Sequence, residues 1–271
     1  MKKLLNTVLD YRFTPWVMAA LVVVGYGLSI PAMGFFMDDW YLIWYKHIFG
    51  ALQYPVYFSV DRPLMGYFYV AANFLLGNTE SAFVWQVFGL FTRWLCAFAL
   101  WGFLKTLWPN ARRQNALVAL LACVFPGFTQ QWIAIIYSFF FSCLACFFLS
   151  LTLMLKAVRT PRRFWLYTAL SLITGVYAYA AAEFYFGLEL IRPVVLWIEY
   201  ARAVPTFKGR LWKTIKTAIP FIIAYLIYGI WRAFFFVSVN HGVAMTDRLK
   251  ASPLSVIGDL IQRIYQAGVD G

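Results

Sequence analysis

Two adjacent carboxylates, Asp38 and Asp39, follow the first long apolar stretch of this chain. The chain has only 11 acidic residues among 271, so a neighbouring pair is notable. Adjacent carboxylates repel each other, and such a pair can accept a proton as a general base or hold a divalent cation. We expect Asp38 or Asp39 to be the base, with both as metal ligands if a divalent cation takes part. The alternative is that they are solvated carboxylates that only cap the interfacial helix that follows them.

Five further polar residues are expected on the same side of the molecule. Arg62 and Arg232 are candidates for gripping a phosphate, because a guanidinium group can bind a phosphate through two parallel hydrogen bonds. Asp61, Glu183 and His241 are additional candidates there. Asp61 also has a structural interpretation, as the N-cap of the helix that follows it.

The composition is that of a membrane protein. Hydrophobic residues make up 63% of the chain and charged residues 13%, whereas soluble domains are about half apolar and a quarter charged. Several apolar runs approach or exceed the length of about 20 residues that spans a bilayer as a helix. We therefore predict an all-α, polytopic membrane protein formed as a single module over residues 1–271.

The net charge of +12 reflects the membrane topology of the chain rather than binding to nucleic acid. Most of the 23 basic residues lie in four short segments between alternate apolar runs. The positive-inside rule makes these segments cytoplasmic and places them beside anionic lipid. We accordingly expect no nucleic-acid partner, an N-terminus in the cytoplasm, and a location in a plasma membrane such as the bacterial inner membrane.

The apolar runs predict about seven transmembrane helices. A long first outer loop, 34–80, separates the first two and contains aromatic-rich interfacial helices over 40–49 and 62–76. An outer C-terminal segment, 238–271, follows the last span and includes an amphipathic stretch at 253–267. The predicted spans are 15–33, 81–104, 114–126, 132–155, 164–182, 185–200 and 217–237.

The third predicted helix is short. At 1.5 Å per residue, 114–126 covers roughly 20 Å of a hydrocarbon core that is about 30 Å thick. Pro126 and Gly127 then end it. Gln130 and Gln131 would lie at or below the outer membrane surface, where polar side chains indicate a water-accessible recess or shielding by protein.

Charged residues inside predicted spans need a partner. Arg93 lies near the middle of 81–104, and we expect it to anchor that helix to a carbonyl or an acid on another helix. Glu189 and Arg192 are three residues apart, so they can neutralise each other on one helix face. We interpret the four cysteines, all within apolar runs, as packing residues.

These features together resemble the GT-C superfamily of membrane glycosyltransferases, which includes protein O-mannosyltransferases and lipid A aminoarabinose transferase. One helix precedes a long outer loop, and that loop opens with Asp38-Asp39. The loop continues through two interfacial helices, with Asp61-Arg62-Pro63-Leu64 at the second, and further spans follow with the turn Phe125-Pro126-Gly127-Phe128. The resemblance covers residues of about 15–240.

The resemblance implies transfer of a sugar from a polyprenyl-phosphate donor to the hydroxyl of an acceptor lipid, glycan or protein, with inversion, on the non-cytoplasmic face. It assigns the base to Asp38 or Asp39, and the donor phosphate to Arg62 and Arg232. Members commonly continue into more helices and an outer domain. We therefore expect a segment of a longer protein, a minimal member, or part of a complex with further subunits.

Two non-catalytic functions remain open. A flippase or transporter for lipid-linked sugars would need polar residues running through the helix bundle. A membrane assembly subunit would tolerate substitution of the outer-face polar residues.

Overall fold

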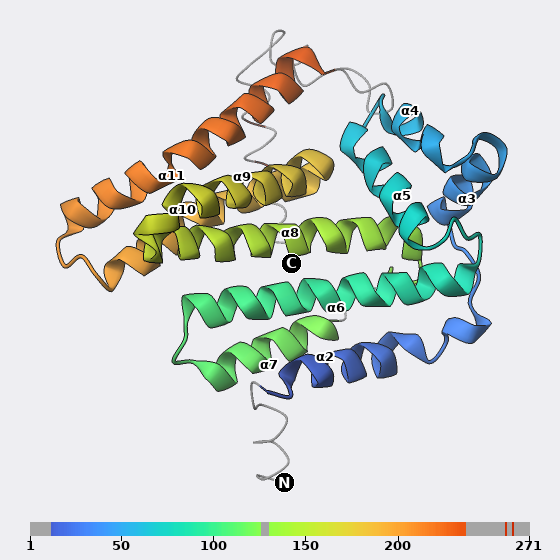
Figure 1. Ribbon diagram of the computed structural model, residues 1–271, viewed down its shortest axis with the longest axis horizontal. Coiled ribbons are helices and arrows are strands. Elements are labelled where there is room, and N and C mark those ends of the chain that lie inside the picture. Colours follow the sequence, from blue (N-terminus) through green and yellow to red (C-terminus); the bar gives the residue numbers. More distant parts are fainter. Residues whose placement is uncertain (1–11, 126–129, 237–257, 259–261, 263–271) are drawn as a thin grey trace.

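Two long antiparallel helices form the centre of the molecule. The computed structural model describes residues 12–125 and 130–236, with residues 258 and 262. In Figure 1, α6 (Ala82–Leu107) lies beside α8 (Ala134–Arg159). On the far side of α6 lie α2 (Thr14–Val22) and α7 (Arg112–Cys123). On the far side of α8 lie α9 (Phe164–Ala181), α10 (Ile191–Ala201) and α11 (Phe207–Ile230).

Helices and connecting turns make up the described residues, with no strand among them, which confirms the all-α prediction. Five of the described helices are long and apolar enough to cross a membrane, consistent with an integral membrane protein. Two predicted spans, 114–126 and 185–200, are not among them. The five are Thr14–Ala32, Ala82–Leu107, Ala134–Arg159, Pro161–Ala181 and Phe207–Ile230.

The first of these is not a regular α-helix along its length. After α2 the backbone widens into a π-helical stretch, η1 (Val23–Gly27), and ends in a 3₁₀ turn, η2 (Ile30–Ala32). The predicted boundaries of 15–33 agree with this composite helix.

The segments predicted to span the membrane at 114–126 and 185–200 differ from the prediction in the structure. α7 has 12 residues, or about 18 Å of helix, which is too short to cross a bilayer. In the second stretch, a 3₁₀ helix, η5 (Glu183–Leu190), leads into α10. Pro193 does not interrupt α10. It lies in the first turn of α10, where a proline is tolerated, and the irregular part comes before it.

The last predicted span also begins earlier than expected. α11 starts at Phe207, ten residues before the predicted 217, and includes the basic residues Lys208, Lys213 and Lys216. Beyond Ile230 the chain continues as a π-helical turn, η6 (Trp231–Phe235). The predicted outer segment 238–271, with its amphipathic stretch at 253–267, lies outside the described residues apart from residues 258 and 262.

The segment after the first helix folds into three helices at one end of the bundle (Figure 1). α3 (Asp38–Phe49) and α5 (Pro63–Leu75) occupy the stretches predicted to be helical. A 3₁₀ turn, η3 (Ala51–Gln53), and an unpredicted helix, α4 (Tyr54–Phe58), connect them. Asp61 is not the N-cap of α5, because Arg62 holds that position and no side chain caps the helix.

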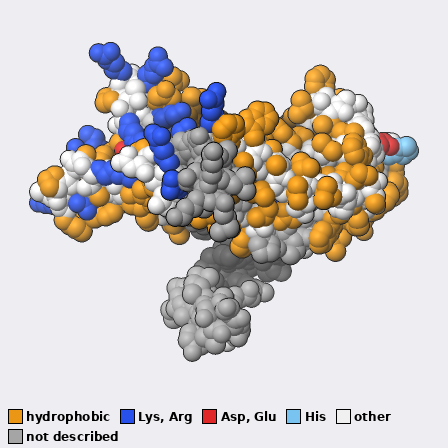
Figure 2. Space-filling model, turned by 90° about the horizontal axis from the view of Figure 1, so that it is seen from below, with side chains coloured by type: hydrophobic (Ala, Val, Ile, Leu, Met, Phe, Trp, Pro, Cys, Tyr) orange, Lys and Arg blue, Asp and Glu red, His pale blue; other side chains and the backbone are white. Residues whose placement is uncertain are grey.

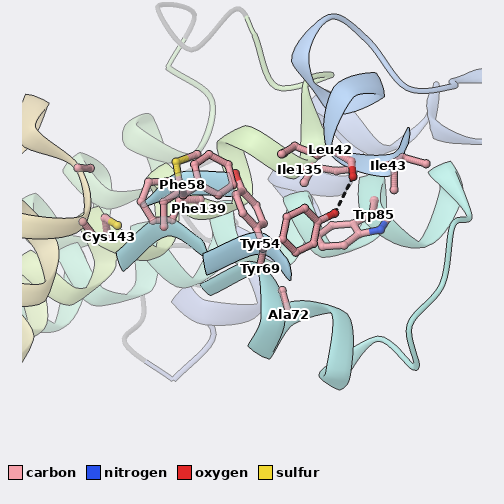
Figure 3. Close-up of a cluster of buried hydrophobic side chains, with 13 residues drawn as sticks. Leu42, Ile43, Tyr54, Phe58, Tyr69, Ala72, Trp85, Ile135, Phe139 and Cys143 are labelled. Atoms are coloured by element: carbon pink, nitrogen blue, oxygen red, sulfur yellow. Dashed lines mark hydrogen bonds between the residues drawn. The ribbon is translucent and has the colours of Figure 1, made fainter. Parts of the chain in front are cut away.

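An aromatic core joins these three helices to α6 and α8 (Figure 3). Tyr54 and Tyr69 are almost completely buried, their rings pack at a tilt against each other, and Tyr69 also packs against Phe139 of α8. The hydroxyl of Tyr54 donates a hydrogen bond of 2.8 Å to the Leu42 carbonyl, drawn as a dashed line in Figure 3. This core fixes the position of α3, and therefore of the two aspartates at its start.

Basic side chains are segregated from that end. Figure 2 shows Lys and Arg gathered at one end of the molecule, while the opposite end is mostly hydrophobic. The turns that follow α6, α8 and α10 lie together at the end opposite α3, α4 and α5 (Figure 1). This separation of charge along the bundle is what the positive-inside pattern requires of a membrane protein.

The contact between α4 and α5 depends on a glycine. A Cβ atom added to Gly66 would lie 2.6 Å from the Cα of Pro55 and 2.6 Å from the carbonyl oxygen of Tyr54. Both are backbone atoms and cannot move aside. We predict that Gly66→Ala destabilises the protein by roughly 1–3 kcal/mol, as overpacking does, and lowers the melting temperature in detergent.

Gly102→Ala in α6 is the matched control, because its Cβ would have no neighbour within 4 Å. We expect it to leave the melting temperature unchanged or to raise it, since alanine favours a helix over glycine. Equal melting temperatures for the two variants would contradict the close contact of α4 with α5.

Candidate functional site

Asp39 is a buried helix cap. Its side chain has no exposed surface, and its Oδ1 accepts hydrogen bonds from the backbone amides of Ile135 (3.1 Å) and Ile136 (3.2 Å). These amides belong to the first turn of α8 and have no partner within that helix. Asp39 therefore caps α8 from α3, 96 residues away in the sequence, where the helix dipole also favours a carboxylate.

Burial makes Asp39 a weaker acid than an ordinary aspartate. Removal from water raises its pKa from 3.8 to about 7, although the hydrogen bonds from α8 act in the opposite direction and Asp38 adds a smaller upward effect. Its other oxygen, Oδ2, is buried without a hydrogen-bond partner among the described residues. Asp39 is therefore a cap, but a buried one on the distant helix α8 rather than the solvated cap of its own interfacial helix.

Asp38 is placed differently from its neighbour. Its side chain is exposed, and it lines a cavity of about 590 Å³ at the junction of α3, α5, α8 and η5. The two carboxylates thus face different surroundings, one an open cavity and the other the start of α8. Only Asp38 is positioned to meet a ligand.

The cavity combines polar groups with aromatic walls. Arg62 and Gln130 contribute polar atoms beside Asp38, and Tyr137 of α8 hydrogen-bonds to the Gln130 side chain. Gln130 thus borders a recess, as its position in the sequence predicted. The full lining consists of Met37, Asp38, Arg62, Met65, Gln130, Ile133, Ile136, Tyr137, Phe140, Phe141, Phe184 and Tyr185. The apolar and aromatic residues of this lining could not be identified from the sequence, because they come from separate helices and share no motif.

Arg62 is held by Glu183 in a two-pronged ion pair. Its Nη2 lies 2.7 Å from Glu183 Oε1, and its Nε lies 3.0 Å from Oε2. Its Nη1 lies 3.3 Å from Asp61 Oδ2, and its guanidinium stands 5.2 Å from the ring centre of Phe184. Three of the residues singled out in the sequence therefore meet at one edge of the cavity.

Arg232 joins the same cluster from η6. Its Nη1 donates a hydrogen bond of 3.0 Å to the backbone carbonyl of Asp61. Its Nη2 lies 3.9 Å from Asp61 Oδ1 and 4.0 Å from Glu183 Oε1. We refer to Asp61, Arg62, Glu183 and Arg232 as the charge cluster, and its formal net charge is zero. His241, the remaining candidate, lies outside the described residues.

The expected role of Arg93 as an anchor is confirmed. From the middle of α6 its guanidinium donates hydrogen bonds to the Cys123 carbonyl (2.8 Å), the Gln131 side chain (3.0 Å) and the Tyr26 hydroxyl (2.6 Å). It also lies 3.7 Å from the centre of the Tyr26 ring. Arg93 thereby ties the end of α7 and the following turn to the bundle.

Glu189 and Arg192 form the expected pair, with Nε to Oε2 at 2.6 Å and Nη2 to Oε1 at 2.7 Å. Both side chains are buried, and Arg192 Nη2 also donates to Ser150 at 3.0 Å. All of these bonds stay within the packed helices, so this pair has a structural role.

A shared metal site between the two aspartates does not fit this geometry, because one oxygen of Asp39 is bound to α8 and the other is buried. Among the described residues, no group of three or more His, Cys, Asp or Glu side chains is arranged to hold a metal ion. Asp38 is therefore the carboxylate through which this cavity would contact a cation.

No protein-family model, curated protein or solved structure matches this chain significantly, so the geometry of the site carries the functional argument alone.

The buried cap predicts a dependence of stability on pH. The pKa of Asp39 is higher in the folded protein than in the unfolded chain, so the folded state binds the proton more tightly. The stabilisation is complete below about pH 4 and is lost as the pH rises towards about 7. The wild-type protein should lose roughly 3–4 kcal/mol of its unfolding free energy between pH 4 and pH 8. We predict that Asp39→Asn abolishes this loss, because its neutral side chain still accepts hydrogen bonds from the α8 amides.

Melting temperatures recorded across this range in detergent measure the effect. Asp38→Asn is the control, because Asp38 is exposed and its variant should retain the wild-type pH dependence. Parallel curves for wild type and Asp39→Asn would show that Asp39 stays ionised in the folded protein.

Proposed function

We propose that this protein is a membrane glycosyltransferase that moves a sugar from a polyprenyl-phosphate donor to an acceptor hydroxyl. One observation supports the proposal above the others. A single cavity of about 590 Å³ is lined by an exposed carboxylate, Asp38, and by a guanidinium group, Arg62. A base and a phosphate-binding cation beside one cavity are the two groups that such a transfer needs.

In this proposal Asp38 is the general base and Asp39 supports it. Asp38 takes the proton of the acceptor hydroxyl as the oxygen attacks the anomeric carbon of the sugar. The bond from that carbon to the donor phosphate oxygen breaks, and the configuration inverts. Asp39 acts at a distance from the reacting atoms, because its cap on α8 holds the start of α3 against the wall of the cavity.

The leaving phosphate carries the charge that develops in the transition state. Arg62 and Arg232 are the cations proposed to stabilise it, and they approach the cavity edge from the start of α5 and from η6. The aromatic walls, including Phe140, Phe184 and Tyr185, provide the apolar surface that a lipid chain or a sugar face prefers.

The proposed topology follows from the basic end of the molecule. With the turns after α6, α8 and α10 in the cytoplasm, the cavity faces the non-cytoplasmic side, where the acceptor lipid, glycan or protein would be found. A seven-span arrangement would require α7 and the η5–α10 segment to complete their crossings together with neighbouring elements or further subunits.

Substitution of the base tests the proposal. We predict that Asp38→Asn lowers the rate of sugar transfer by roughly 10²–10⁴-fold, the usual effect of removing a general base. The measurement is transfer of radiolabelled sugar from a polyprenyl-phosphate donor pool in membranes that contain the protein.

Asp39→Asn is the matched control, because it keeps the hydrogen-bond acceptor for α8 and leaves Asp38 intact. We expect it to retain most of the wild-type rate. Full activity of Asp38→Asn would exclude the carboxylate from catalysis. Loss of activity in both variants, with normal folding, would mean that the two acids act together.

A further inference from the structure

Glu183 occupies the place where an anionic ligand of the two arginines would bind. Its carboxylate accepts both prongs of the Arg62 guanidinium, at 2.7 Å and 3.0 Å, and its Oε1 is also 4.0 Å from Arg232 Nη2. Two cations from distant segments thus approach one carboxylate oxygen. A phosphate oxygen is recognised by guanidinium groups in the same two-pronged geometry.

The ion pair is accessible from outside. The Arg62, Glu183 and Arg232 side chains retain 15%, 29% and 23% of their exposed surface. The Glu189–Arg192 pair, by comparison, retains only 2% for Arg192 and 6% for Glu189, and serine hydroxyls complete its hydrogen bonds. An ion pair that only holds helices together can be sealed from water and fully hydrogen-bonded within the protein, as this one is. The pair at Glu183 stays within reach of water and of a ligand in the cavity.

Charge also favours exchange of Glu183 for an outside anion. Without Glu183, the charge cluster retains two arginines and Asp61, which leaves a formal charge of +1. A phosphate monoester carries nearly two negative charges and three acceptor oxygens at neutral pH, whereas a glutamate carries one charge and two oxygens. The exchange therefore adds charge and hydrogen-bond acceptors beside the two guanidinium groups.

We propose that Glu183 is an internal counter-ion which holds the anion site of Arg62 and Arg232 until a phosphate monoester displaces it. The inference deepens the proposed function and rests on it for the identity of the ligand, which is the polyprenyl phosphate released from the donor when the sugar is transferred. The exchange makes and breaks no covalent bond. It predicts that Glu183 competes with the ligand, so that the affinity measured for wild-type protein is below the intrinsic affinity of the arginines.

Displacement would also change the wall of the cavity. Glu183 is the first residue of η5, and the next two residues, Phe184 and Tyr185, line the cavity. Release of Glu183 from Arg62 removes the ion pair that holds the start of η5 near α5. Binding of the phosphate group is thereby linked to the position of two aromatic rings that border the remainder of the ligand.

Removal of the counter-ion should tighten binding. We predict that Glu183→Gln, which keeps the shape of the side chain, binds phosphate monoesters roughly fivefold more tightly than wild type. The probes are inorganic phosphate and farnesyl phosphate, titrated into the full chain in detergent and followed by calorimetry. Arg62→Gln should weaken binding of both probes, because it removes the two-pronged contact.

Glu199→Gln is the matched control. Glu199 forms a similar two-pronged pair with Arg159, at 2.6 Å and 2.7 Å, outside the cavity. We expect this variant to bind both probes as wild type does. Should Glu183→Gln fail to fold, Glu183→Asp tests the same point, because the shorter side chain weakens the pair and should also tighten binding.

Tighter binding of farnesyl phosphate alone would show that the site needs the lipid chain of its ligand, and equal tightening of both probes would show that it recognises the phosphate group alone. Either result supports the inference. Unchanged or weaker binding of both probes by the Glu183 variant would overturn it and make the charge cluster a structural clamp. The test measures binding rather than transfer, so absence of sugar transfer by the wild-type protein would exclude the proposed reaction and leave this result standing.

Discussion

The broken connection between α7 and α8 imposes the constraint on which the site depends. Helix ends inside an apolar bundle leave backbone carbonyls and amides that must find partners within the protein. Arg93 donates to the Cys123 carbonyl at the end of α7, and Asp39 accepts the Ile135 amide at the start of α8. Gln86 of α6 bonds to the Trp132 carbonyl in between. Side chains from α3 and α6 therefore make the break possible.

This constraint separates the roles of two neighbouring acids. Asp39 satisfies the backbone of α8, and the bond draws α3 against the cavity wall that α8 provides. Asp38, one residue earlier, is left exposed to the cavity. The cluster of Arg62 and Glu183 lies at the edge of the same cavity, joined across 121 residues. A single junction of α3, α5, α8 and η5 thus supplies a carboxylate, guanidinium groups and aromatic walls.

Helices formed by long apolar runs could be predicted from the sequence. Helices that depend on tertiary packing, or that begin in a polar stretch, could not. α6, α8 and α9 agree with predicted spans within a few residues, because long apolar runs have few alternatives in a bilayer. α4 was missed, since its five residues are stabilised by packing of Tyr54 and Phe58 in the aromatic core. The start of α11 was missed because Lys208 and Lys213 lower the local hydropathy there without breaking the helix.

By itself the sequence determined an all-α chain with membrane-length helices, basic turns at one end, and the pairing of Glu189 with Arg192. These properties follow from composition and local spacing. Only the tertiary structure decided that Asp39 is a cap and that Asp38 lines the cavity. It also decided that Arg62 and Arg232 share Glu183. The physical reason is that these roles depend on contacts between residues far apart in the sequence, 96 residues for Asp39 with Ile135 and 121 for Arg62 with Glu183, which local spacing does not encode.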